Sequence, residues 1–293
     1  MSKTIISILA GLGGMFGWGT SDFLANQAAD RIGAKRAFFY SQFAGVLLIL
    51  IITLVTQQVL LLPLSLLIKL VYLGVVYALG YLFFYRGFEI GNVAVVSAVI
   101  NLQAVLSMVV VFLFRGQRLT PIQIPAVFIL LLGIFLVSVN FNELKKGAVV
   151  LARGVKETLL ATIFFGILFW PYNEIVLEQN NLLWVTALTK IFALIFVFGV
   201  MKYLKEQLAL SQGIHRNKSL WLLVAATGIL EAGAMLSVNF GTQVGDGILV
   251  QPIAASLTVV TVSLALIFLK EKIAKLQALG IAMTICGIIL TAL

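Results

Sequence analysis

Charged side chains are scarce in this sequence, where they make up 11% of 293 residues. A soluble domain carries about 25% charged residues and roughly 45–50% apolar ones. Here the residues of the AVILMFWYC set account for 61% of the chain. So little polar surface cannot cover a water-soluble fold, and we expect lipid to be the solvent of most of the chain.

Reactive and metal-binding side chains are also few. The chain has one cysteine, Cys286 in an apolar run, and one histidine, His215 in a polar stretch. Metal centres need clustered Cys, His or carboxylate ligands, and a thiol nucleophile needs a neighbouring base. The Gly-x-x-x-x-Gly-Lys pattern of nucleotide hydrolases does not occur. We therefore expect no enzyme, no cofactor and no metal.

The net charge of +9 does not indicate a nucleic-acid binder. Lys and Arg lie in short breaks between apolar runs, such as Arg31, Lys35 and Arg36, without a basic helical face or an RNA-binding motif. Basic residues that flank membrane spans are the usual reason for such a bias.

Ten apolar stretches of about 20 residues are separated by turn residues, and each is long enough to cross a bilayer as a helix. The first stretch is longer than the apolar region of a signal peptide and is followed by more spans, so it reads as a membrane helix. The polar stretches 141–157 and 202–218 have room for short surface helices. The expected membrane helices are 5–28, 37–56, 66–87, 92–114, 121–140, 158–177, 182–204, 219–240, 247–269 and 273–292.

The sequence repeats itself at a shift of 154 residues, or 152 near the start of each half. Apolar helices resemble one another by chance, so matched glycines, tryptophans and polar residues carry the comparison. The matches are Gly74 with Gly228, Gly133 with Gly287, Trp18 with Trp170, Asp22 with Glu174, Tyr77 with Glu231 and Ser97 with Gln251.

Each copy holds five spans, and an odd number makes the second copy enter the membrane from the opposite side. The sequence therefore predicts an all-α polytopic membrane protein with ten transmembrane helices as two inverted five-helix repeats. The repeats cover residues 1–141 and 158–293, with a connecting segment at 142–157. This architecture is typical of secondary transporters, which bind solute near the midplane between the repeats.

Several motifs carry a family resemblance. The run Trp-Gly-Thr-Ser-Asp-Phe (18–23) and the turns Phe-Arg-Gly-Gln-Arg-Leu (114–119) and Leu-Lys-Glu-Lys-Ile (269–273) resemble the EamA-type branch of the drug/metabolite transporter (DMT) superfamily. That family commonly has Gly-Glu in these turns, where this chain has Gly-Gln and Lys-Glu. The resemblance covers nearly the whole chain. It implies a transporter with both termini in the cytoplasm and leaves the solute open among amino acids, sugars, nucleotide-linked metabolites and drugs.

The distribution of basic residues favours the opposite orientation. The connections after odd-numbered spans carry 15 of the 20 Lys and Arg residues, and the side that holds both termini carries 4. The positive-inside rule then places both termini outside the cytoplasm.

Helices 1 and 6 carry matched polar groups. Trp18 and Asp22 lie one helical turn apart, and Trp170 with Asn173 and Glu174 repeats the arrangement. An indole beside a carboxylate binds an ammonium group by charge and cation–π attraction. Both acids also lie towards a helix end, where contact with water is the alternative explanation for them.

Glu231 lies near mid-depth of its span, where it needs a partner or a proton, and a proton there would suit proton coupling. Its repeat mate Tyr77 begins an aromatic stripe with Tyr81, Tyr85 and Phe88. Such a stripe belongs to helix packing more often than to a binding site.

Lys190 is the only basic residue well inside an apolar run. It either neutralises Glu174 or Glu231 in a structural ion pair or holds the carboxylate of a solute. Gln42 is its approximate counterpart in the first half and is compatible with a polar lining.

Helices 4 and 9 contribute Ser97, Asn101 and Gln251, which either line a solute pathway or hold helices together. Pro252 removes a backbone donor and can leave a carbonyl group facing a polar interior.

Together these features predict a secondary transporter of a small metabolite, such as an amino acid or amine, with a central site lined by helices 1, 3, 4, 6, 8 and 9. It works by alternating access, coupled to protons or to exchange, and the excess of buried acids over bases favours zwitterionic or cationic solutes. The alternatives are a lipid-carrier flippase, a channel and an intramembrane lipid-modifying enzyme. We expect a multi-pass protein of a prokaryotic cytoplasmic membrane, a monomer or weak homo-oligomer, with the bilayer and the solute as partners.

Overall fold

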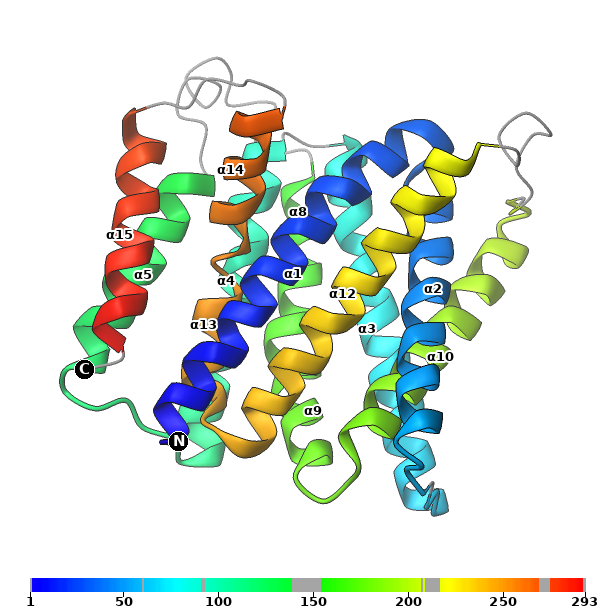
Figure 1. The fold of residues 1–293 in the computed structure, drawn as a ribbon, viewed down its shortest axis with the longest axis horizontal. Coiled ribbons are helices and arrows are strands. Elements are labelled where there is room, and N and C mark those ends of the chain that lie inside the picture. The colour runs from blue at the N-terminus through cyan, green and yellow to red at the C-terminus, as the bar shows by residue number, and fades with distance from the viewer. Residues whose placement is uncertain are drawn as a thin grey trace.

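The computed structural model describes residues 2–59, 61–90, 93–138, 154–206, 208, 217–268 and 275–291. Ten helical segments cross the molecule, one of them interrupted (Figure 1). The polar stretches 141–157 and 202–218 lie largely outside the described residues, and so does any surface helix in them. The segments are α1 (Lys3–Ile32), α2 (Ala34–Val55), α3 (Leu64–Ile90), α4 (Val93–Arg115), α5 (Gln123–Ser138), α8 (Val155–Ile163) with the π-helix η1 (Phe164–Phe169) and α9 (Trp170–Leu177), α10 (Leu182–Tyr203), α12 (Lys218–Val244), α13 (Gly247–Ala254) with α14 (Leu257–Phe268), and α15 (Lys275–Thr291).

The ten predicted spans are confirmed to within a few residues at each end. Seven of the segments are long and apolar enough to cross a membrane, and α4, α5 and α15 contain shorter apolar helices. In Figure 1 α1 begins and α15 ends on one face, which we call the termini side, and α1, α3 and α10 end on the opposite face, which we call the side of the odd-numbered connections. Large apolar side chains such as Leu54 and Phe128 are exposed on the outside, as lipid contact requires.

Side-chain caps fix two of the helix starts. Asn181 accepts the backbone N–H groups of Leu183 and Trp184 at 3.0 and 3.2 Å and begins α10. Asn217 accepts the N–H of Leu220 at 3.1 Å and begins α12. Each cap satisfies donors that the first turn of a helix leaves unpaired.

Prolines lie at two irregular positions in the helices. Pro171 follows η1, and because proline has no N–H, the regular α-helical bond to the carbonyl four residues earlier cannot form. Pro252 lies inside α13, which ends at Ala254 before α14 resumes at Leu257. The sixth span is therefore one continuous helix with a π-helical stretch, about as long as the sequence predicted, whereas the ninth is interrupted between Ala254 and Leu257.

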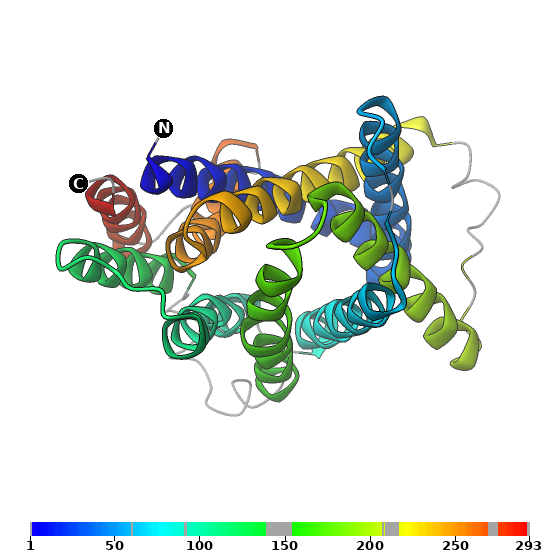
Figure 2. The ribbon, with the colours of Figure 1, turned by 90° about the horizontal axis from the view of Figure 1, so that it is seen from below.

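The helices form two bundles related by a pseudo-two-fold axis. In the first, α1 packs extensively against α12, with α2, α13 and α14 beside them; in the second, α3 packs against α8, with α4 and α10 beside them. Each contact within the first bundle has an equivalent contact, between the repeat mates of the same helices, within the second bundle. The pairs α2–α10 and α5–α15 each join a helix to its own repeat mate. In Figure 2 the pair α5–α15 lies at one end of the molecule and α2 towards the other. These contacts agree with the predicted inverted repeats, with the axis in the membrane plane.

Matched glycines mark the closest helix crossings. A Cβ on Gly74 would meet the carbonyl of Thr189 at 2.9 Å and the amide nitrogen of Ala193 at 3.0 Å, so α3 approaches α10 backbone to backbone. Gly228 on α12 stands in the same relation to Ser41 and Gly45 on α2. The two crossings make Thr189 on α10 the repeat mate of Ser41 on α2, a shift of 148 residues between these two helices. With the same shift, Lys190 corresponds to Gln42 and Thr186 corresponds to Phe38.

Candidate functional site

Several residues touch their own repeat mates, which places them on the pseudo-two-fold axis. The rings of Trp18 and Trp170 meet edge to face with their centroids 5.5 Å apart. The hydroxyl of Tyr77 donates to Glu231, 154 residues later, at 2.6 Å. Because the axis of an inverted repeat runs along the membrane midplane, these contacts lie at mid-depth.

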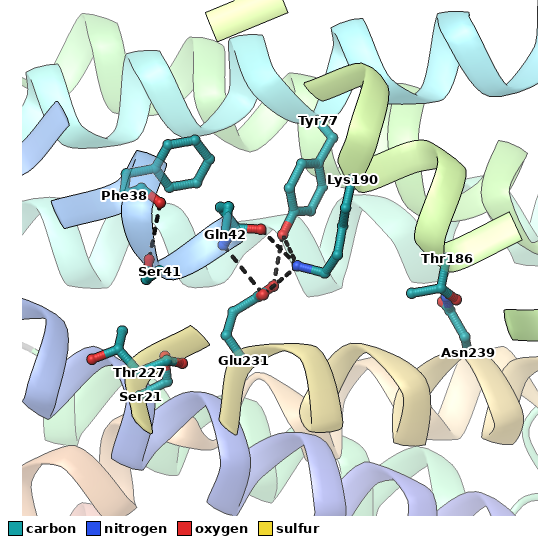
Figure 3. Close-up of polar contacts among 10 residues, drawn as sticks. All are labelled: Ser21, Phe38, Ser41, Gln42, Tyr77, Thr186, Lys190, Thr227, Glu231 and Asn239. Carbon is teal, nitrogen blue, oxygen red and sulfur yellow. Dashed lines mark hydrogen bonds and ion pairs between the residues drawn. The ribbon is translucent and has the colours of Figure 1, made fainter. Parts of the chain in front are cut away.

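Four polar side chains form one connected cluster on this axis, which we call the axial quartet (Figure 3). Lys190 forms an ion pair with Glu231, and both side chains are buried, with 0% and 6% exposed. Gln42 bridges the two charges: its Oε1 accepts from the Lys190 ammonium at 2.6 Å, and its Nε2 donates to Glu231 Oε2 at 3.2 Å. Tyr77 completes the quartet at Glu231 Oε1.

The quartet joins the two bundles. Gln42 and Glu231 come from the first bundle, and Tyr77 and Lys190 come from the second. The partner that Glu231 needs at mid-depth is therefore Lys190, and of the two ion pairs foreseen for Lys190 the one with Glu231 is present. A charge that is buried with a partner and several hydrogen bonds is tolerated where an isolated one is not.

Aromatic rings pack around the quartet, most of them from the second bundle. Tyr77 lies 4.8 Å from Tyr81 and 5.2 Å from Phe169, centroid to centroid. Tyr81 also contacts Phe38 at 5.0 Å and Phe165 at 5.2 Å. The side chains of Tyr85 and Phe88, the rest of the predicted stripe, lie outside the described residues.

The side chain of Asp22 is solvent-accessible, although it lies on the face of α1 that is turned towards the interior of the protein. The lipid-facing side of α1 is marked by Ile5, Leu9 and Phe16, which are 46–56% exposed. Asp22 follows the buried Met15 by seven residues, which places it on a different face of the helix from those three. It lies within electrostatic reach of Glu231, and no hydrogen bond or ion pair joins it to any residue the structure describes.

Glu174, the repeat mate of Asp22, lies in a different environment. Glu174 is 3% exposed and lies in α9, near the termini side. It accepts a hydrogen bond from the side-chain amide of Gln117. Gln117 Oε1 in turn accepts the N–H of Ile248 at 3.0 Å, in the first turn of α13. Glu174 therefore belongs to a cluster on the termini side and not to the axial quartet.

Asn173 belongs to a second buried network. Its amide donates to Asn239 Oδ1 at 2.8 Å, and the Asn239 amide donates to Thr186 Oγ1 at 2.8 Å. Thr186 on α10 and Asn239 on α12 lie one to two turns from the quartet residues of the same helices (Figure 3). Asn239 and Gln117 were not among the residues predicted from the sequence, although an Asn within an apolar span indicates a buried polar contact.

The remaining candidates lie elsewhere. Asn101 is buried and donates to Thr258 at 3.4 Å, between α4 and α14. Gln251 is buried in α13, beside the proline of the broken span. Ser97 lies in α4, but its side chain is outside the described residues. No group of three or more His, Cys, Asp or Glu that could hold a metal ion occurs among the residues described.

Ten spans in two inverted repeats, with a charged cluster on the axis between them, define a membrane transport protein of the inverted-repeat class. The chain belongs to the EamA-like transporter family, whose profile matches residues 5–139 and 152–293. Members of this family are generally transporters and not enzymes.

The fold is shared with solved structures. One of them, described only as "Crystal structure of protein", superimposes with a TM-score of 0.79 over 98% of each chain at 17% sequence identity. At this identity the likeness shows the fold alone. No curated protein matches the sequence.

Proposed function

We propose that this protein is a secondary transporter of a small zwitterionic or cationic metabolite, such as an amino acid or an amine, and that it works by alternating access. The observation that carries the proposal is Asp22: an exposed carboxylate without a bonded partner among the described residues, on an inward helix face near the axial quartet. A carboxylate in such a place attracts an ammonium group more strongly than it would in water.

Trp18 supports the ammonium assignment. It lies one turn before Asp22, on the same side of α1, and against Trp170. Its Nε1–H is buried and has no acceptor among the described residues. The ammonium group of a bound amino acid can contact both the Asp22 carboxylate and the face of the Trp18 ring. The carboxylate of the same amino acid can accept a hydrogen bond from the Trp18 N–H.

Asp22 is also the better candidate for an exchangeable proton. Glu231 is held by Lys190, Gln42 and Tyr77, so a proton on it would break the ion pair. Asp22 has no such bonds to break. Transport coupled to protons or to solute exchange would therefore act through Asp22, with the quartet as a fixed charged wall.

Uptake into proteoliposomes tests the proposal. Purified protein is assayed against a panel of amino acids, amines, sugars and phosphorylated metabolites, with and without a pH gradient. We expect saturable uptake of an ammonium-bearing solute and its loss by about tenfold or more in Asp22→Asn, because the charge that holds the ammonium is gone.

Glu206→Gln is the matched control. It removes a carboxylate from a partly exposed ion pair with Lys35, which contributes little to stability. This variant should transport like the wild type. Uptake of the same solute by Asp22→Asn with unchanged affinity would contradict the assignment of Asp22, and selective uptake of sugars or phosphates would contradict the solute class.

A further inference from the structure

The two faces of the protein differ in access to the interior. Asp22 is exposed towards the side of the odd-numbered connections, whereas its repeat mate Glu174 is 3% exposed on the termini side. In a symmetric arrangement the two would be equally exposed. The structure is therefore closed on the termini side.

Packing between the bundles shows the same difference. On the termini side α9 of the second bundle contacts α12 of the first. The equivalent helices on the other side are α1 and α3, which make no comparable contact between described residues. Between these helices the described residues pack more closely on the termini side, whereas on the other side the bundles are joined by α2 and the residues after α10, through Lys35–Glu206 and Tyr40–Leu208.

Buried amides cross the seam between the bundles at this closed end. Asn239 on α12 of the first bundle accepts from Asn173 on α9 and donates to Thr186 on α10, both of the second bundle. The three side chains are 0–1% exposed, so these hydrogen bonds are shielded from water. Buried bonds of this kind are costly to open unless new partners replace them.

Gln243 adds a second layer one turn further along α12. Its side-chain amide donates to the backbone carbonyls of Leu177 and Asn180, at 2.5 and 3.0 Å, where α9 ends. With Asn239 it forms two polar contacts on one face of α12, both directed at the second bundle.

At the positions equivalent to the Asn239 network, the first repeat carries no amide side chain. Ser21 stands in the place of Asn173 and donates to the carbonyl of Thr227 at 3.0 Å, within the first bundle and not across the seam. Phe38 stands in the place of Thr186 and has no polar group, and Tyr85 stands in the place of Asn239. The amide network is therefore specific to the termini side.

We infer that Asn239 and Gln243 form a latch that holds the termini side closed, and that the resting protein is open on the side of the odd-numbered connections because of it. The latch joins α12 to α9 and α10 and must break each time the bundles rock about the axial quartet. The inference rests on the proposed transport cycle, since only alternating access requires the termini side to open.

Cysteine labelling at a pair of repeat mates tests the latch without any solute. Ala25 and Leu177 correspond at the shift of 152; Ala25 is partly exposed, whereas Leu177 is fully buried. With the exposed Cys286 replaced by Ser, Ala25→Cys and Leu177→Cys are each treated with a membrane-impermeant maleimide in proteoliposomes. We expect rapid labelling at position 25 and almost none at position 177.

Asn239→Leu, which keeps the branched shape of the side chain and removes both hydrogen bonds, should raise the labelling rate of Leu177→Cys by about tenfold and lower that of Ala25→Cys. Gln243→Met should have the same effect and serves as the second variant if the first does not fold. Gln277→Met is the control, because Gln277 also donates to a carbonyl, that of Val137, but between α5 and α15.

Unchanged labelling at position 177 in a folded latch variant would overturn the inference, and so would an equal rise in the control. Labelling needs no solute, so these results are independent of the uptake assays. A latch that opens as expected in a protein that transports no ammonium-bearing solute would contradict the proposed function alone.

Discussion

Asp22 and Glu231 are carboxylates in the same interior with opposite surroundings. Glu231 has an ammonium ion, an amide and a phenol within hydrogen-bonding distance. Asp22 has none of these among the described residues and is exposed. A charge saturated by protein donors holds the structure together, whereas an unsaturated one is available to a ligand. This difference separates the structural carboxylate from the one we assign to solute binding.

Removing one member of the ion pair should be far more harmful than removing both. Glu231→Gln leaves the Lys190 ammonium buried without a counter-ion, which costs about 3–5 kcal/mol of folding free energy. Adding Lys190→Met removes the stranded charge and should restore most of the stability. Thermal unfolding in detergent would measure both variants. A single variant that unfolds at the wild-type temperature would show that the pair does not act as a unit.

The sequence predicted where each helix begins and ends better than it predicted which helices pack against each other. The length of the apolar stretches predicted all ten segments, and the matched glycines Gly74 and Gly228 mark equivalent crossings of α3 with α10 and of α12 with α2. The π-helix before Pro171 was not predicted, because a proline within an apolar run is compatible with a kink, a break or a wide turn.

The glycine crossings give a prediction on a single helix. At Gly228 a Cβ would collide with the backbone of α2, so Gly228→Ala should cost about 1–3 kcal/mol through forced separation of the helices. At Gly233, also on α12, an added Cβ meets nothing within 4 Å, and alanine should stabilise the helix by about 0.5–1 kcal/mol. Unfolding temperatures of the two variants should move in opposite directions. Equal shifts would contradict the close crossing.

The site was harder to predict from the sequence than the fold. The repeat comparison aligned Tyr77 with Glu231 and Trp18 with Trp170, but it could not show that each residue touches its own mate. Contact between mates depends on where the pseudo-two-fold axis passes, and a sequence gives the order of the repeats and not the position of their axis. For the same reason it could not show that Glu174 lies apart from the quartet.

In the whole molecule, two bundles lie on either side of the axial quartet, and contacts between α9 and α12 close the seam between them on the termini side. The bundles are related by symmetry, so an equivalent state closed on the other side is available by exchanging their roles. The two states need not be equally populated, because the amides of Asn173 and Asn239 occur in one half only.

Counterflow in proteoliposomes tests whether the two bundles alternate their access to the solute. Vesicles are loaded with an unlabelled ammonium-bearing solute, and the entry of a trace of the labelled solute is followed. An alternating-access carrier returns faster when loaded, so we predict that internal solute accelerates entry and that Asp22→Asn abolishes the acceleration. Entry that rises linearly with concentration and does not respond to internal solute would show a channel instead, and would contradict the account.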